Sequence, residues 1–263
     1  MIKNKNIKIK KVLSIAGSDC SSGAGIQADI KTINSLGGYC LTAISAVTSQ
    51  NSRKVFKIQS LPSKIIISQI KAVYDDIGFD SVKIGMLPDD LVAKKIAFFF
   101  KNKSIPIVVD PVFVSTTGKN LVQRNKFIKC QEHLYSISNI ITPNLIEAEV
   151  LTKLKIKDLN DMYNACDFLS QKTDASIFLK GGEICGKICT DLFYEKGKFT
   201  KFNYKRIKTN NTHGTGCTLS SAIAFYLSCG ENPIKSIKLA KRYILKTINN
   251  SPKLGLKYGP LGH

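Results

Sequence analysis

The sequence predicts an α/β fold, in which a mainly parallel β-sheet has helices on both of its faces. Short apolar runs of strand length alternate along the chain with segments whose apolar residues recur at helical spacing. The 263 residues contain no linker, low-complexity segment or internal repeat, so we expect one domain over 1–263. Small, polar or charged residues follow several expected strands, at the sheet edge where such folds bind ligands.

The elements expected in the first half are apolar segments bounded by turn residues. Ile26, Ile30 and Ile33 recur at helical spacing, and Gly37 follows that helix as a C-terminal stop. Pro62 is suited to a helix start. The strands expected here lie at 12–16, 40–47, 55–58 (a small edge strand), 81–84 and 107–109, with a loop at 17–23. The helices lie at 24–35, 64–74 and, capped by Asp89, up to 101.

The second half continues the alternation. Lys196 and Gly197 form a turn between two runs that indicate an antiparallel pair of strands. The strands expected in this half lie at 140–142, 176–179, 189–194 and 199–204. The helices lie at 125–135, 159–172, 218–229 and 233–250, and a further helix starts near 143–147.

The net charge of +20 raises the possibility of nucleic-acid binding. The lysines are spread over every region, however, apart from a modest basic N-terminal segment at 1–11. We therefore expect no nucleic-acid partner, and a basic surface that attracts phosphorylated substrates. The eight cysteines are scattered without metal-binding spacing, so we expect reduced thiols and a cytoplasmic protein. No apolar stretch reaches the ~18 residues of a membrane span.

The stretch 211–217 carries the clearest chemical signal. Gly214 and Gly216 let the backbone turn tightly and approach a ligand, directly before an expected helix. Thr215 and Thr218 are candidate caps of that helix. Its unpaired N–H groups and positive dipole end suit a phosphate or a developing oxyanion. Cys217 would lie in the first turn, where this field favours the thiolate.

A second glycine-rich stretch, at 23–28, matches the Gly-x-Gly-x-x-Ala pattern of dinucleotide-binding proteins. Six residues separate it from the expected strand, and no carboxylate follows between Asp29 and Asp75, so we disfavour a Rossmann dehydrogenase. The loop is better interpreted as a substrate seat. Asp29 is available there to accept hydrogen bonds from an amine or hydroxyl, although it could simply be an exposed helix residue.

The chain has no Walker A sequence, so ATP would have to bind at 214–217 through backbone N–H groups. Asp110 and Glu147 are candidate Mg²⁺ ligands, because each is a carboxylate at the expected ligand-binding edge. Lys180 follows an apolar strand and could hold phosphates, or could be a solvated lysine. His213 precedes a turn glycine and suits a supporting hydrogen bond better than a general base.

Seven motifs in this order resemble one known family. They are Ala16-Gly-Ser-Asp19, Gly23-Ala-Gly-Ile-Gln-Ala-Asp-Ile-Lys-Thr32, Lys83-Ile-Gly-Met-Leu87, Asp110-Pro-Val112, Thr142-Pro-Asn-Leu-Ile-Glu-Ala148, Leu179-Lys-Gly-Gly182 and Asn211-Thr-His-Gly-Thr-Gly-Cys-Thr-Leu-Ser220. The chain resembles the hydroxymethylpyrimidine/phosphomethylpyrimidine kinases of thiamine biosynthesis, within the ribokinase-like superfamily, from about 12 to 261. The resemblance implies a three-layer αβα fold. It also implies ATP-dependent, Mg²⁺-assisted phosphorylation of 4-amino-5-hydroxymethyl-2-methylpyrimidine, and then of its monophosphate.

The resemblance also implies roles for individual residues. Those expected to line the pyrimidine pocket are Gly17, Asp29, Gln50, Met86 and Val112. Those expected to act in catalysis are Gly214, Thr215 and Gly216 of the anion hole, Lys180 on the transferring phosphate and Cys217 as the base. Those expected to bind nucleotide are Asn144, Lys180, Thr212 and Gly214, with Asp110 and Glu147 on the metal. A homodimer is also implied. A related kinase acting on pyridoxal, pyridoxine or a sugar is the alternative.

The sequence departs from the family pattern in the first loop. Cys20 stands where the family usually has proline, and Ser22 stands where it usually has glycine. These departures bear on the conformation of the loop at 17–23 and leave the proposed catalytic residues untouched.

Overall fold

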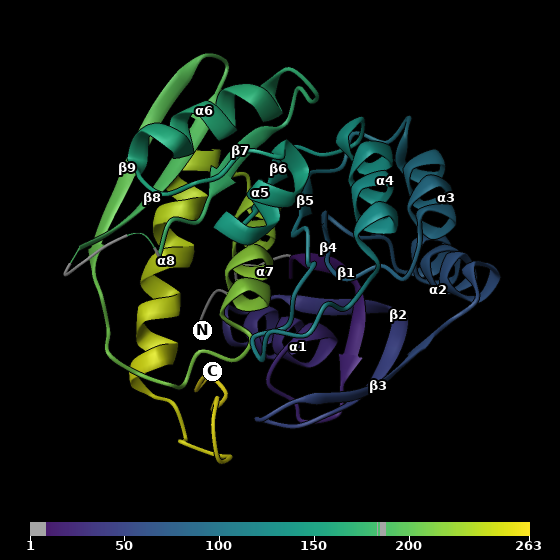
Figure 1. Ribbon diagram of the computed structural model, residues 1–263. Helices are drawn as coiled ribbons and strands as arrows, with labels where there is room; N and C mark the ends of the chain where they lie inside the picture. Colours follow the sequence, from purple (N-terminus) through teal and green to yellow (C-terminus); the bar gives the residue numbers. More distant parts are fainter. Residues whose placement is uncertain (1–8, 183, 185–187) are drawn as a thin grey trace, which may run out of the picture.

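The computed structural model describes residues 9–182, 184 and 188–263. Within these residues one nine-stranded sheet has the order β3-β2-β1-β4-β5-β6-β7-β8-β9 (Figure 1). The strands are β1 (Lys11–Asp19), β2 (Tyr39–Gln50), β3 (Val55–Ser60), β4 (Ser81–Ile84), β5 (Ile107–Val109), β6 (Ile140–Ile141), β7 (Ser176–Leu179), β8 (Ile188–Glu195) and β9 (Lys198–Lys205). The helices are α1 (Gly25–Ser35), α2 (Ser63–Asp76), α3 (Asp90–Phe100), α4 (Arg124–Tyr135), α5 (Leu145–Thr152), α6 (Leu159–Ser170), α7 (Thr215–Ser228) and α8 (Pro233–Asn249).

The six inner strands, from β2 through β7 in sheet order, are parallel. The short strands β4 to β7 are fully buried apolar runs apart from Ser81, Lys83 and Ser176, as expected for strands covered on both faces. β3 pairs antiparallel with β2 at one edge, and β8 and β9 add antiparallel strands at the other. The expected α/β class, the edge strand and the antiparallel pair are therefore confirmed.

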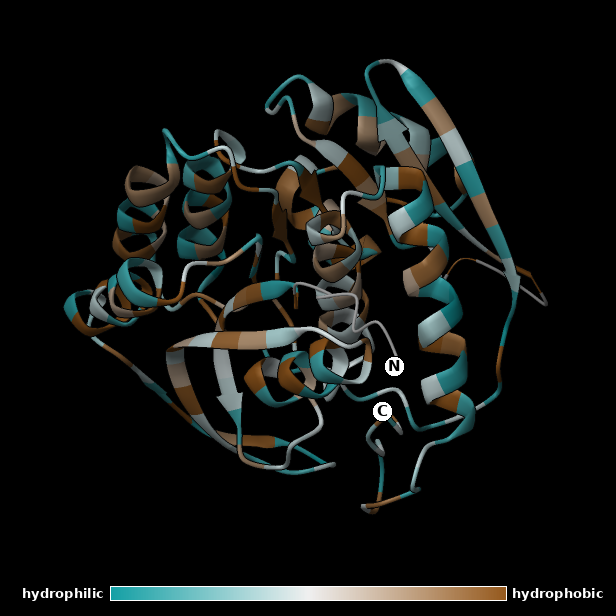
Figure 2. Ribbon diagram, turned by 180° about the vertical axis from the view of Figure 1, so that it is seen from behind, coloured by the Kyte–Doolittle hydropathy of each residue, from teal (hydrophilic) through white to brown (hydrophobic). Residues whose placement is uncertain are grey.

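Helices cover both faces of the sheet. One apolar core joins α1, α7 and α8 to the sheet, and includes Ile33, Ile223 and Ile244. A larger core lies on the opposite face under α2 to α6, and includes Ile66, Ile96 and Leu169. Figure 2 shows hydrophilic and hydrophobic residues alternating along the edge strand β9, in which Lys201, Asn203 and Lys205 are exposed. This three-layer arrangement leaves the carboxyl ends of the parallel strands open at one rim.

Two elements differ from the sequence prediction in ways that matter for the site. β1 extends to Asp19 instead of ending near 16, because it stays paired with β2 beyond a register shift after Ala16. Helix α7 begins at Thr215 instead of 218, with Gly214 as its N-cap and no side-chain cap. The expectation that Thr215 and Thr218 cap this helix is therefore wrong, because a left-handed glycine turns the chain directly into the helix.

Three further expectations concern membrane spans, the basic N-terminal segment and the cysteines. Among the helices of the described residues, none combines the length and apolar character needed to cross a membrane. Most of the basic N-terminal segment, residues 1–8, lies outside the described residues, as does Cys185. The cysteines that are described form no disulfide.

Candidate active site

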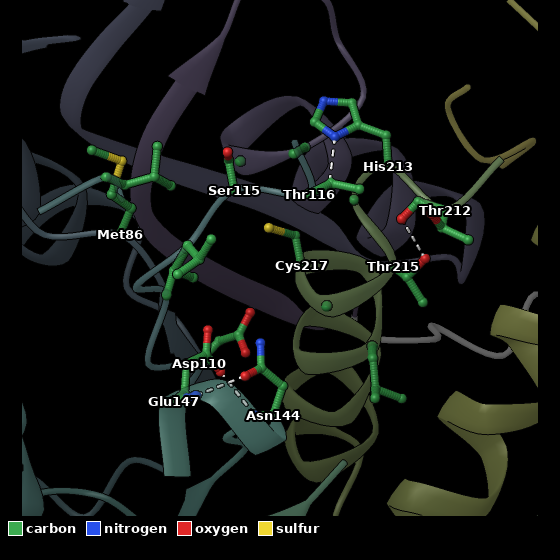
Figure 3. A pocket seen from close by; sticks show the side chains of 18 of the residues that line it. Met86, Asp110, Ser115, Thr116, Asn144, Glu147, Thr212, His213, Thr215 and Cys217 are labelled. Carbon is green, nitrogen blue, oxygen red and sulfur yellow. Dashed lines mark hydrogen bonds between the residues drawn. The ribbon is translucent and has the colours of Figure 1, made fainter. Parts of the chain in front are cut away.

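A cavity of about 640 Å³ opens at the carboxyl ends of the parallel strands. It receives side chains from the ends of β1, β2, β4, β5 and β7, from the loop after β5 and from the first turns of α5 and α7 (Figure 3). The predicted site residues that line it are Gly17, Gln50, Met86, Asp110, Val112, Asn144, Glu147, Lys180, Thr212, Gly214, Thr215, Gly216 and Cys217. The topology thus brings together residues as far apart in the chain as Gly17 and Cys217.

The N-terminus of α7 forms one wall of the cavity. Gly214 has φ +86°, and a Cβ on it would lie 1.8 Å from the carbonyl oxygen of Gly23. A glycine is therefore required both for the left-handed turn and for the close approach of two backbones. The amides of Gly216 and Cys217 have no hydrogen-bond partner within the described residues. These unpaired donors, at the positive end of the helix dipole, form a seat for an anion.

Cys217 presents its sulfur to this cavity. Figure 3 shows the side chain pointing away from α7 into the space that Asp110 and Glu147 also face. Burial raises the pKa of the Cys217 thiol to about 11, although the charge of Lys83 opposes the change. The expectation that the helix terminus lowers the pKa of this thiol is therefore wrong, because the cost of burying a negative charge exceeds the effect of the helix terminus.

Asp110 and Lys180 form an ion pair beside the first turn of α7. Lys180 Nζ donates to Asp110 Oδ1 at 2.9 Å, and Thr142 Oγ1 donates to the same oxygen at 3.0 Å. Burial acts to raise the pKa of Asp110, but the positive charges of Lys180 and Lys83 hold it below its ordinary value. A Cβ on Gly216 would lie 3.5 Å from Lys180 Nζ, so this cation lies against the anion seat. The pair therefore places fixed charge where a phosphate would bind.

Glu147 is fixed by the start of α5. Its side chain accepts a hydrogen bond from the amide of Asn144 at 2.8 Å, while Asn144 Oδ1 accepts from the amide of Glu147 at 2.8 Å. This capping box explains why the sequence places Asn144 three residues before Glu147. Burial, together with repulsion from Asp110, raises the pKa of Glu147 to about 7 despite the attraction of Lys180. Asp110 and Glu147 repel each other when both are ionised, so a cation bound between them would be favoured.

Asp19 and His213 join the first loop to the stretch before α7. Asp19 Oδ2 accepts hydrogen bonds from the amides of Gly23 and Ala24, at 3.1 and 2.8 Å. His213 Nε2 lies 2.8 Å from the same oxygen. A Cβ on Gly23 would lie 2.1 Å from the His213 ring, so the two loops fit only with glycine there. His213 thus has the supporting role expected from its position, and it helps to shape the cavity wall.

We expect Asp19→Asn to destabilise the protein at neutral pH and to lose that effect in acid. Burial opposes ionisation, but the hydrogen bonds from His213 and Ser21 hold the pKa of Asp19 well below its ordinary value. The carboxylate therefore stabilises the fold above pH ~4, and this contribution is lost as the pH falls further. Thermal unfolding should show a deficit of about 2 kcal/mol for the variant at pH 7, narrowing between pH 4 and pH 3. A deficit that is constant over this range would contradict the assignment.

Asp29 does not take the place that the sequence suggested. Its side chain is fully buried beneath the cavity wall, where it is paired with Lys83, and it does not line the cavity. The expectation that Asp29 contacts a ligand is therefore wrong. α1 turns this position inward, and the carboxylate oxygens are taken up by Lys83, Ser14 and Ser221.

The structure also reveals cavity residues that sequence reasoning did not select. Lys83 of β4 borders the cavity but is itself fully buried, and its signal was a lysine within an otherwise apolar strand. At another part of the cavity, Lys241 of α8 pairs with Asp191 of β8 at 2.7 Å. Thr116 reaches the cavity from the loop after β5 and lies 3.4 Å from His213 Nδ1. Pairings between distant segments such as these leave no spacing signal in the sequence.

The family model and the curated relatives agree on one family. The family model described as phosphomethylpyrimidine kinase matches residues 19–262. The chain is 39% identical over 253 residues to the thiamine biosynthesis bifunctional protein ThiED of Geobacter sulfurreducens, covering 96% of this chain and 52% of that protein. The chain thus spans about half the length of the bifunctional relatives that it matches.

A full-length relative and a solved structure complete the comparison. The chain is 37% identical over 254 residues to the hydroxymethylpyrimidine/phosphomethylpyrimidine kinase of Rhizobium meliloti, covering 95% of this chain and 96% of that protein. The structure of the pyridoxal kinase from Staphylococcus aureus in complex with AMP-PCP is 30% identical, with a TM-score of 0.88, covering 97% of this chain and 93% of that one. The fold is therefore the ribokinase-like three-layer fold that the motifs implied.

Proposed function

The chain belongs to the phosphomethylpyrimidine kinase family, and we propose that it transfers the γ-phosphate of ATP to 4-amino-5-hydroxymethyl-2-methylpyrimidine and then to its monophosphate. Residues 1–263 would act as one kinase domain in thiamine biosynthesis. The observation that carries this proposal is the single cavity that holds both an anion seat at Gly214 to Cys217 and the Asp110–Lys180 pair. Phosphoryl transfer needs both features, because the oxygens of the transferring group must be hydrogen-bonded and their negative charge must be neutralised.

The substrate would bind beside the anion seat. Gly17, Gln50, Met86 and Val112 line this part of the cavity. A Cβ on Gly17 would lie 3.1 Å from the sulfur of Met86, so glycine keeps this wall open for a flat ring. The amide of Gln50 could pair with the aminopyrimidine edge, since it offers both a donor and an acceptor.

Cys217 would take the proton of the substrate hydroxyl. The resting group is a thiol, so it must first release its proton to solvent. The thiolate then accepts the hydroxyl proton as the substrate oxygen bonds to the γ-phosphorus and the bond to the bridging oxygen of ADP breaks. Each turnover thus releases one proton overall. In a loose phosphoryl transfer the hydroxyl loses its proton late, so a small thiolate population is sufficient.

Mg²⁺ fits the oxygen donors that Asp110 and Glu147 provide. Both carboxylates are buried at the cavity, and among the described residues Asp110 Oδ2 accepts one long hydrogen bond, from Ser220 Oγ at 3.4 Å. No cluster of three or more His, Cys, Asp or Glu occurs among the described residues. We therefore propose that the two carboxylates share the ion with water and phosphate oxygens, which suits Mg²⁺. When bound, it would neutralise charge on the polyphosphate.

The test is ADP release with hydroxymethylpyrimidine, its monophosphate, pyridoxal and ribose in parallel, using wild type and Cys217→Ala. We expect turnover with both pyrimidines. Cys217→Ala should lower kcat by about 10²-fold or more with little change in KM, because the group acts in the transition state. Turnover with ribose alone would overturn the substrate assignment, and a near-wild-type kcat for Cys217→Ala would remove the proposed base.

Pyridoxal or pyridoxine is the second candidate substrate. The observation that favours it is the close structural similarity to the Staphylococcus aureus pyridoxal kinase. Both rings carry a hydroxymethyl group that could reach Cys217 in the same way. A kcat/KM for pyridoxal above that for hydroxymethylpyrimidine, in the same ADP assay, would make it the primary substrate.

We also propose that the enzyme is a cytoplasmic homodimer, as the family resemblance implies, with no nucleic-acid or membrane partner. The free thiols among the described cysteines suit a reducing compartment. Sedimentation equilibrium of the purified protein tests the dimer, and salt-dependent retention on DNA would contradict the absence of a nucleic-acid partner.

A further inference from the structure

Lys83 and Asp29 form an ion pair that is closed off from solvent. Lys83 Nζ lies 3.0 and 2.8 Å from the two carboxylate oxygens of Asp29, and both side chains are 0% exposed. A buried pair of this kind is weak evidence for stability, because well-packed apolar residues often serve as well or better. Its presence directly beneath the cavity therefore calls for a functional explanation.

Asp29 connects this pair to the helix that carries Cys217. Ser221 Oγ donates to Asp29 Oδ1 at 2.7 Å. Ser221 follows Cys217 by four residues in α7, so the two side chains lie on one face of the helix. Ser14 Oγ in β1 donates to the other carboxylate oxygen. Asp29 is thus fixed between the sheet and α7, one turn below the thiol.

Lys83 is the cation that acts most strongly on Cys217. The charged and polar groups that influence the thiol are Lys83 of β4, Asp29 of α1, Asp110 after β5, Lys180 after β7 and the backbone N–H of Gly25. Burial raises the pKa of Cys217, Lys83 lowers it, and Asp29 and Asp110 raise it by smaller amounts. Lys83 itself lines the cavity next to Gly85, where an added Cβ would lie 2.8 Å from Nζ.

We propose that Lys83 is a positioning residue for Cys217, whose buried charge compensates the thiolate that accepts the substrate proton, and that Asp29 fixes Lys83 in that place. This inference rests on the proposed function, because it assumes that Cys217 is the base. It explains why a fully buried ion pair lies under the first turn of α7. It also gives Asp29 a part in the reaction without contact to the substrate.

The test compares two variants that keep hydrogen-bonding groups but remove one charge each. Lys83→Gln removes the cation and leaves Asp29, whereas Asp29→Asn removes the anion and leaves Lys83. Iodoacetamide reacts with the thiolate, so its rate at Cys217, followed by peptide mass spectrometry at pH 7.5, reports the ease of ionisation. We expect the rate to fall about tenfold in Lys83→Gln, as a rise of one pKa unit would give. We expect it to rise by a smaller factor in Asp29→Asn, because Asp29 acts on the thiol more weakly than Lys83.

A merely structural role would give a different result. Loosened packing would expose Cys217 in both variants and change both rates in the same direction. Rates that change in the same direction, or that both stay within twofold of wild type, would overturn the proposal. Lys241→Gln is the matched control, since it breaks another Lys–Asp pair at the cavity and should leave the Cys217 rate unchanged.

The double variant Lys83→Gln/Asp29→Asn covers the case in which the single variants do not fold, because it leaves no unpaired buried charge. We expect it to keep the wild-type KM for hydroxymethylpyrimidine and to lose about threefold to tenfold in kcat, because the effect of Lys83 on the thiol exceeds the opposing effect of Asp29. A wild-type kcat in a folded double variant would overturn the proposal. The alkylation rates are measured without substrate, so their outcome does not depend on the proposed function. The proposed function fails separately, if wild type releases no ADP with either pyrimidine.

Discussion

Gly214→Ala should lower kcat/KM by on the order of 10²- to 10³-fold, the loss expected when the donors of an anion seat are displaced. Gly214 has φ +86°, and the added Cβ would lie 1.8 Å from the carbonyl oxygen and 2.9 Å from the carbonyl carbon of Gly23. Both are backbone atoms of a loop held by Asp19, so neither can rotate away. The first turn of α7 must therefore move, and the amides of Gly216 and Cys217 move with it.

Gly230→Ala is the control for Gly214→Ala, because it places alanine in a left-handed backbone without the clash. Gly230 has φ +85°, and a Cβ there meets nothing within 4 Å. Both variants therefore bear a similar backbone strain of roughly 1–2 kcal/mol, but only Gly214→Ala displaces the cavity wall. Steady-state kinetics of the two variants, with thermal unfolding of each, make the comparison. Equal activity in both would show that the close contact between Gly214 and Gly23 does not support catalysis.

Lys180→Met should lower kcat by on the order of 10³-fold while changing the KM for the pyrimidine little, because its charge acts on the phosphoryl group in transit. The variant also leaves Asp110 and Glu147 buried together without their nearest cation. We therefore expect the ligand-free variant to be less stable by about 3 kcal/mol, the lower end of the cost of breaking a buried pair. Added Mg²⁺ should restore its Tm without restoring its activity.

Lys155→Met is the matched control for Lys180→Met. Lys155 pairs with Glu149 at 3.2 Å, but its side chain is 79% exposed, so the pair should contribute less than about 1 kcal/mol. Its kcat should equal that of wild type. If Lys180→Met kept kcat within threefold of wild type, or lost activity through KM alone, Lys180 would have no part in the transfer step.

Much of the fold could be predicted because its signals are local. Short apolar strands such as 81–84 and 107–109 are bounded by turns, and the structure places β4 and β5 at those residues. Asp89 caps α3 as expected, by accepting from the amide of Val92. Parallel strands also bring their carboxyl ends together, which is why residues after separate strands could be expected at one edge.

What could not be predicted depends on burial and on distant contacts. The left-handed cap at Gly214 depends on the backbone of Gly23, which is nearly 200 residues away. Asp29 has the sequence context of a surface helix residue, and its pairing with Lys83 appears only when α1 packs between β1 and α7. The raised pKa of Cys217 likewise follows from desolvation at its site, because the helix terminus alone would lower it.

The most direct test is the structure of the enzyme with a non-hydrolysable ATP analogue, Mg²⁺ and hydroxymethylpyrimidine bound together. We predict the terminal phosphate on the amides of Gly216 and Cys217, with the substrate hydroxyl about 3–3.5 Å from both the phosphorus and the sulfur of Cys217. A polyphosphate bound away from the N-terminus of α7, or a hydroxyl that faces away from Cys217, would contradict the account.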